Sequence, residues 1–214
     1  MPNIKSIEKE VEYEFRKWKK QLLILDKVLS VLAVLLLGVF RPDYVVIVAF
    51  LLVFPYLILT QRKVLFYHLM LSFAVALIWM LIANNQYSYN KDLLTFAGIN
   101  LHPLFSWALG LFTIYVIYSH YEYILKKQNF VRKLLLFMAF YLPVIIVTET
   151  IAYHVFDIQN VAAASYNGLW LCDCIHAPPW MQAAYLLLGP IFFSIIYLLR
   201  LENPHIKVKK SKHF

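Results

Sequence analysis

Charged residues are scarce in this chain of 214 residues. They make up 15% of the sequence, and hydrophobic residues make up 62%. A typical soluble domain has about 25% charged and about 45–50% apolar residues. The sequence also lacks a nucleotide-binding glycine loop, a nucleophile elbow and a complete zinc-protease motif. These absences argue against a soluble domain and against NAD-, ATP- or serine-dependent chemistry.

In place of such motifs the chain has six long apolar segments: residues 21–40, 43–60, 64–83, 102–125, 130–156 and 180–201. Each is close to the roughly 20 apolar residues that cross a bilayer core of about 30 Å. The sequence therefore predicts an all-α, polytopic integral membrane protein with six transmembrane helices arranged as three hairpins. We expect a cytoplasmic segment at 1–20, the transmembrane domain at 21–201 and a basic cytoplasmic tail at 202–214.

Lysine and arginine are distributed unequally between the two sides of these segments. Nearly all lie in the N-terminal segment, the tail and the connections after the second and fourth spans, and the other side has only Arg41 and Lys91. Because positive residues near span ends stay in the cytoplasm, both termini are predicted to be cytoplasmic. Anionic lipid at the membrane edge then accounts for the net charge of +8, and nucleic acid is not an expected partner.

The segment 1–20 has its own pattern. Its apolar residues recur at helical spacing with charges between them: Ile4, Ile7, Val11, Phe15 and Trp18. Such a stripe predicts an amphipathic helix that lies flat on the cytoplasmic membrane surface. The alternative is a helix that covers the cytoplasmic ends of the bundle.

The two long external connections resemble each other. Ser88-Tyr89-Asn90 in the first matches Ser165-Tyr166-Asn167 in the second, and each connection ends with an Ile-to-Pro segment of equal length before a span. This shared order predicts an internal duplication with repeat-like units at about 64–125 and 130–201. Internal repeats in membrane proteins often form a site at their shared interface. The alternative is that Asn and Pro are simply frequent in interfacial loops.

Ionisable residues at membrane depth are costly and indicate function. Glu149 lies inside the fifth span, and Tyr153 and Asp157 follow it at i+4 and i+8, on one face if the helix continues. His154 lies three residues before Asp157, where the two side chains can pair. We expect Glu149 to be a proton donor or acceptor, with His154 and Asp157 tuning it or relaying protons. The alternative is a protonated or hydrogen-bonded Glu149 that only locks helices together.

Further polar residues are expected at the mouth of this site, namely His102, Asp173 and His176. The segment Cys172-Asp173-Cys174-Ile175-His176 alternates its Cys and His residues. In an extended chain these three side chains point the same way, which suits copper or zinc. The alternative is a pair of free cysteines. A disulfide between residues two apart closes a very small ring, so no structural disulfide is expected, and no other cofactor is predicted.

Part of the chain resembles a known family. The segments are Leu77-Ile78-Trp79, residues 87–92 (YSYNKD) and residues 98–103 (GINLHP) with the aromatic-rich span that follows. They are similar to the lycopene cyclase domain family, small membrane proteins of carotenoid biosynthesis that cyclise the ends of a polyene by proton-initiated chemistry without net redox change. The family has an acidic residue where this chain has Met80, and paired carboxylates where it has Leu104-Phe105-Ser106. The resemblance therefore implies a fold and a substrate class, and it transfers no catalytic residue.

Together these observations predict a membrane-embedded enzyme that acts on an isoprenoid, carotenoid-like or lipid substrate by acid–base chemistry near the external leaflet. Its expected partners are membrane lipid, a hydrophobic small molecule and, in a homo-oligomer or a larger membrane complex, other protein subunits. Two alternatives stay open. One is a non-enzymatic accessory or scaffold subunit of a membrane complex, and the other is a metal-handling membrane protein.

Overall fold

The computed structural model describes residues 24, 28, 39–125, 129–163, 165–170, 172–201 and 203–205. The chain divides into two units, Met1–Arg41 and Pro42–Phe214. The predicted amphipathic segment 1–20 and most of the first predicted span lie outside the described residues, as does most of the tail. The fold that positions the candidate site belongs to the second unit.

Five long helices form this unit: α2 (Pro42–Leu59), α3 (Lys63–Ala83), α4 (Leu101–Tyr121), α5 (Phe130–His154) and α6 (Pro179–Leu198). All five are long and apolar enough to cross a membrane, which is compatible with a multi-pass membrane protein. Their positions closely match the five predicted spans from residue 43 onward. The last turn of the predicted fourth span is a 3-10 helix, Glu122–Leu125.

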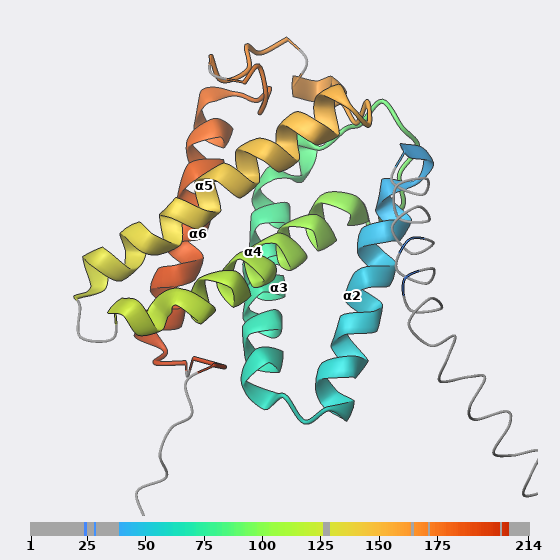
Figure 1. Cartoon of the computed structure of the whole chain (residues 1–214). Helices are drawn as coiled ribbons and strands as arrows, with labels where there is room; N and C mark the ends of the chain where they lie inside the picture. Colours follow the sequence, from blue (N-terminus) through green and yellow to red (C-terminus); the bar gives the residue numbers. More distant parts are fainter. Residues whose placement is uncertain are drawn as a thin grey trace, which may run out of the picture. The chain divides into compact units, whose positions relative to one another are not determined.

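Helix α4 lies at the centre of the unit and contacts α2, α3, α5 and α6 (Figure 1). Half of its most apolar stretch, 50%, is buried inside the protein, compared with 17% for α5. The difference places most of α5 at the periphery, so that any polar group it carries inside the protein must lie on its narrow face toward α4 and α6. In a membrane protein such faces are where polar residues are expected.

Local sequence explains the ends of several helices. The Asn100 side chain caps α4 by accepting a hydrogen bond from the His102 backbone N–H at 3.0 Å, and Asn129 caps α5 through the Arg132 N–H at 3.1 Å. Pro179 is the first residue of α6, where its missing N–H costs nothing. These caps fix the first turns of the helices that carry the predicted site residues.

Helices α5 and α6 approach each other closely at Gly189. A Cβ atom added at Gly189 would lie 2.7 Å from ring carbons of Tyr141, and both the glycine and the Tyr141 ring are buried. Below this contact, Phe137, Phe193 and Tyr118 pack edge-on and face-to-face, with ring centroids 5.0–5.7 Å apart. Small residues allow close helix packing in a membrane, where van der Waals contact is the main attraction between helices.

The two long connections meet at one end of the unit, which we call the loop end; it carries residues 84–100 and 155–178. Tyr89 and Asn160 form an antiparallel bridge. The Asn90 N–H donates to Gln159 O at 2.9 Å, and the Val161 N–H donates to Ser88 O at 2.6 Å. A short hairpin of β1 (Thr95–Phe96) and β2 (Ile99–Asn100) completes the first connection. The loop end is therefore an interlocked structure.

Replacing Asn160 by alanine is expected to loosen this loop end. Its Oδ1 accepts the Ser88 N–H at 3.2 Å, and its Nδ2 donates to Gln86 O. Loss of both bonds leaves backbone groups of residues 86 and 88 without their side-chain partner. Hydrogen–deuterium exchange at residues 84–92 should rise several-fold. The same change at the exposed Asn85 is the control, and an unchanged exchange rate in the Asn160 variant would contradict the role of these bonds.

Candidate active site

Glu149 lies on the last turns of α5, half-buried. Among the described residues, its carboxyl group forms no hydrogen bond or ion pair. Its charge acts on the hydroxyls of four tyrosines: Tyr87, Tyr89, Tyr141 and Tyr185. A carboxyl group with no fixed partner inside a membrane helix is costly, so its position beside a group of hydroxyls indicates a function.

Two of these tyrosines belong to a buried polar group that we call the Tyr87 cluster, which consists of Trp79, Tyr87, Trp107 and Tyr185. Tyr87 Oη accepts hydrogen bonds from the indole Nε1 atoms of Trp79 at 2.8 Å and Trp107 at 3.0 Å. It also lies 3.0 Å from Tyr185 Oη. All four side chains are buried. They come from α3, the loop that follows it, α4 and α6, so the cluster joins elements that are distant in sequence.

The direction of the last hydrogen bond follows from the inventory of donors. An indole N–H can only donate, and the two indoles together use the acceptor positions of Tyr87 Oη. Tyr87 must therefore donate its own proton to Tyr185 Oη. Burial raises the pKa of Tyr87 well above its usual value, which keeps the hydroxyl protonated and able to donate.

The Tyr185 hydroxyl is the member of the cluster whose O–H is not used as a donor within it. It accepts from Tyr87, and its own O–H has no other hydrogen-bond acceptor among the described residues. Tyr141, on α5, donates its proton to the backbone oxygen of Tyr185. Among the described residues, the Tyr185 O–H therefore has no fixed acceptor.

His102 approaches the cluster from the other side, through Tyr89. The Tyr89 ring lies 6.2 Å from that of Tyr87 and 5.6 Å from that of His102, centroid to centroid. His102 lies in the first turn of α4. Its Nδ1 is buried without a partner in the described part of the chain. Asp43, which is fully buried and accepts the Leu94 N–H at 3.0 Å, acts on the imidazole electrostatically.

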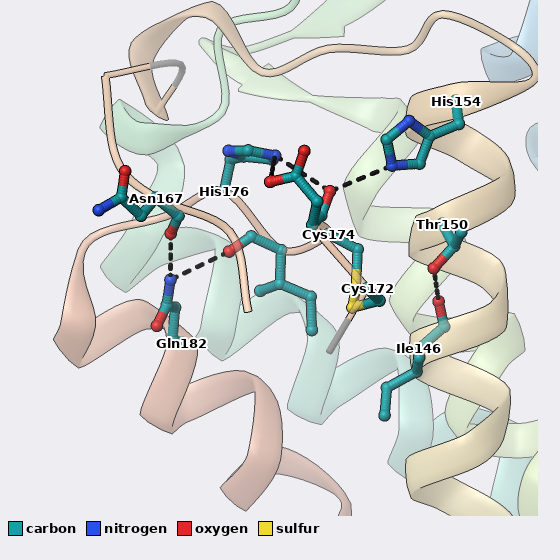
Figure 2. Close-up of a disulfide and its surroundings, with 10 residues drawn as sticks. Ile146, Thr150, His154, Asn167, Cys172, Cys174, His176 and Gln182 are labelled. Atoms are coloured by element: carbon teal, nitrogen blue, oxygen red, sulfur yellow. Dashed lines mark hydrogen bonds and ion pairs between the residues drawn. A yellow bond between two sulfur atoms is a disulfide. The ribbon is translucent and has the colours of Figure 1, made fainter. Parts of the chain in front are cut away.

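Three predicted residues come together beside the connection that precedes α6. The Nε2 atoms of His154 and His176 each lie 3.1 Å from the backbone oxygen of Asp173 (Figure 2). The Asp173 carboxylate is 3.4 Å from His176 Nε2, and the Tyr153 ring stacks on His176 at 4.5 Å. The structure therefore brings His154, Asp173 and His176 into one group. That His102, Asp173 and His176 line the mouth of a site stays a prediction.

Glu149 and Tyr153 share a face of α5, but Asp157 does not join them, because the helix ends at His154. The backbone then turns, and Asp157 has a φ of 51°. Its exposed carboxylate accepts a hydrogen bond from Gln159 Nε2 at 2.8 Å. The expected pairing of His154 with Asp157 is replaced by the contact of His154 with Asp173.

The expectation of no disulfide is also wrong. Cys172 and Cys174 are joined, with their Cα atoms 5.1 Å apart, inside the usual range of about 4.4–6.8 Å. The sequence interpretation assumed an extended chain, but Asp173 and Ile175 have φ values of 44° and 56° and turn the backbone. No group of three His, Cys, Asp or Glu side chains in the described ranges is placed to hold a metal ion. Metal binding by Cys172, Cys174 and His176 stays a prediction for the reduced loop.

Sequence reasoning did not single out Trp107, Tyr141 or Tyr185. One signal for them was present, because a Tyr or Trp in the middle of an apolar span needs a hydrogen-bond partner once it is buried. The sequence does not indicate which residue provides that hydrogen bond. Met80, where the cyclase-like pattern has an acid, is fully buried in the core, next in sequence to Trp79.

Comparisons of the chain with protein-family models, with curated proteins and with solved structures found no match. The similarity to the lycopene cyclase domain family therefore stays a prediction. The function of the chain is inferred from the geometry of Glu149 and the Tyr87 cluster.

Proposed function

We propose that this chain is a membrane-embedded enzyme that acts on a hydrophobic isoprenoid, carotenoid-like or lipid substrate by acid–base chemistry at Glu149. The observation that carries the proposal is the Glu149 carboxyl, which forms no hydrogen bond or ion pair among the described residues and acts electrostatically on Tyr87 and Tyr185. A carboxyl group without a fixed partner can take up or release a proton in the reaction. A structural carboxylate inside a bundle is instead held by hydrogen bonds or by an opposite charge.

The residues have distinct roles in this proposal. Glu149 exchanges the proton with the substrate. Tyr185 donates a hydrogen bond to the carboxylate form and stabilises it after proton transfer, and Tyr87 orients Tyr185. General acid–base catalysis of this kind contributes about 10²–10⁴-fold in rate.

The rings around the cluster suit an isoprenoid. The Tyr185 ring lies edge-on to Trp107, with centroids 4.8 Å apart, and to Trp79 at 6.3 Å. Protonation of a double bond makes a carbocation, and the faces of Trp and Tyr rings attract cations. The same apolar rings accept a polyene chain before the proton moves.

We place this chemistry near the external leaflet. The distribution of lysine and arginine supports cytoplasmic termini, which puts the loop end outside. The Cys172–Cys174 disulfide lies at the loop end, and disulfides persist mainly outside the cytosol. Two independent features thus support the same orientation.

Mass spectrometry of the molecules that co-purify with the protein in mild detergent, read beside its visible absorption spectrum, tests the proposal. We expect a specific isoprenoid or polyene at near-stoichiometric level. The Glu149→Gln variant should carry it in an unreacted form and turn it over at least about 100-fold more slowly.

The matched control is Glu122→Gln, at the far end of α4, where Glu122 pairs with Lys133 at 2.9 Å. It should carry the same molecule and turn it over at the rate of the unmodified protein. Two results would overturn the proposal: bulk phospholipid as the only bound lipid, or equal turnover by the Glu149 variant.

A further inference from the structure

The Cys172–Cys174 disulfide has no role in the proposed acid–base chemistry. A cross-link stabilises a fold in proportion to the logarithm of the loop it closes. This bridge has a sequence separation of 2, with only Asp173 between its cysteines. Its entropic contribution is therefore among the smallest a disulfide can make, and a structural staple is a poor explanation for it.

The backbone around the bridge is strained. Asp173 and Ile175 both have positive φ values, 44° and 56°, and a β-branched residue such as isoleucine rarely adopts this conformation. Hydrogen bonds hold the loop in it: the Asp173 N–H donates to Leu169 O at 2.8 Å, and the Leu169 N–H donates to Cys174 O at 2.8 Å. Strain of this kind persists where the surroundings fix it, and it is concentrated at functional sites.

The two sulfurs differ in access. Cys172 is half-buried, and Cys174 is fully buried. Cys172 is therefore the more accessible of the two residues. Exposed or strained disulfides are the labile ones, whereas structural bridges resist reduction by glutathione.

His176 contacts the backbone around this loop at two places. Its Nδ1 lies 2.9 Å from Tyr166 O, and its Nε2 lies 3.1 Å from Asp173 O. In Figure 2, His154 and His176 both contact the backbone carbonyl of Asp173, above the disulfide.

We propose that Cys172–Cys174 is a redox-active disulfide that accepts two electrons from an external dithiol. One thiolate of the dithiol attacks the sulfur of Cys172, the S–S bond breaks, and Cys174 leaves as a thiolate and is protonated. The second thiol of the dithiol attacks the mixed disulfide and releases Cys172. The protein ends with two thiols, and the dithiol becomes a disulfide.

The full chain in detergent micelles is incubated with graded ratios of reduced and oxidised dithiothreitol, or with millimolar reduced glutathione. Free thiols are then trapped by a maleimide reagent that shifts the protein on a gel. We expect both reductants to open the bridge while the helical circular dichroism signal stays unchanged. A bridge that resists glutathione until the protein is unfolded would overturn the proposal.

Single-cysteine variants test the order of attack. Cys174→Ser leaves the half-buried Cys172, which should form a mixed disulfide with oxidised glutathione. Cys172→Ser leaves the buried Cys174, which should react at least tenfold more slowly. Equal or reversed rates would overturn the assignment of Cys172 as the attacked sulfur.

A matched pair at Asp173 tests the contribution of strain. Asp173→Gly and Asp173→Ala both remove the carboxylate, but only glycine adopts a positive φ without cost. At a fixed ratio of reduced to oxidised dithiothreitol, we expect the ratio of reduced to oxidised protein to be at least threefold lower for Asp173→Gly than for Asp173→Ala. Equal ratios would show that the strained backbone does not favour reduction.

Discussion

Phenylalanine in place of Tyr87 is expected to lower the free energy of unfolding by about 3 kcal/mol or more, because each of three buried polar groups left without a partner costs about 1–3 kcal/mol. The single hydroxyl accepts from Trp79 and Trp107 and donates to Tyr185. Its removal leaves two indole N–H groups and one hydroxyl unsatisfied in a buried cluster. Thermal unfolding in detergent, followed by circular dichroism, measures the loss. Tryptophan emission should shift as well, because two of the indoles lose their acceptor.

The control for this substitution is Tyr166→Phe, which removes a hydroxyl at the same loop end. Tyr166 is 40% exposed, and its hydroxyl has no hydrogen bond among the described residues. The change should be nearly neutral. A Tyr87 variant as stable as the Tyr166 variant would mean that the cluster is not the polar core we describe.

Alanine in place of Gly189 is the second large expected effect. The added Cβ would lie 2.7 Å from three ring carbons of Tyr141, and that ring is almost fully buried, at 1% exposure. The ring cannot move without separating α5 from α6. Overpacking of this kind typically costs about 1–3 kcal/mol. The melting temperature of the detergent-solubilised protein should fall accordingly, with parallel loss of the Tyr141 hydrogen bond to α6.

Gly110→Ala on α4 is the matched control. A Cβ atom at Gly110 meets no atom within 4 Å, and alanine is favoured over glycine in a helix interior by about 0.5–1 kcal/mol. This variant should be equal to or slightly more stable than the unmodified protein. A fall in stability equal to that of Gly189→Ala would show that the loss at position 189 is not caused by contact with Tyr141.

The helices could be predicted from the sequence because apolar length alone specifies them, and local residues such as Asn100 and Pro179 fix where they begin. The predictions that failed concern places where the backbone changes direction. Asp157 and Asp173 have positive φ values without being glycine, so no residue type marked the turn. If the backbone is assumed to continue as a helix or as an extended chain past such a turn, the predicted direction of each following side chain is wrong.

The candidate site was predictable only in part. Glu149, a carboxyl group within an apolar span, is visible in the sequence by itself. Its surroundings are not, because the contact between Tyr87 and Tyr185 joins residues 98 positions apart. Such a pairing leaves no periodic pattern. It depends on how α3, α4 and α6 pack, which hydrophobic composition does not determine.

The interlocked loop end has a consequence for the order of folding. The ladder between Ser88–Asn90 and Gln159–Val161 cannot form before the later connection has been made, and the Tyr87 hydroxyl has no Tyr185 to meet until α6 is in place. During synthesis, α3 and α4 are therefore made before Tyr185, and until then the hydrogen bonds around the Tyr87 hydroxyl are incomplete. Closing such distant contacts is the slow part of folding. The Tyr87 cluster is thus completed last, only after the final helix has joined the bundle.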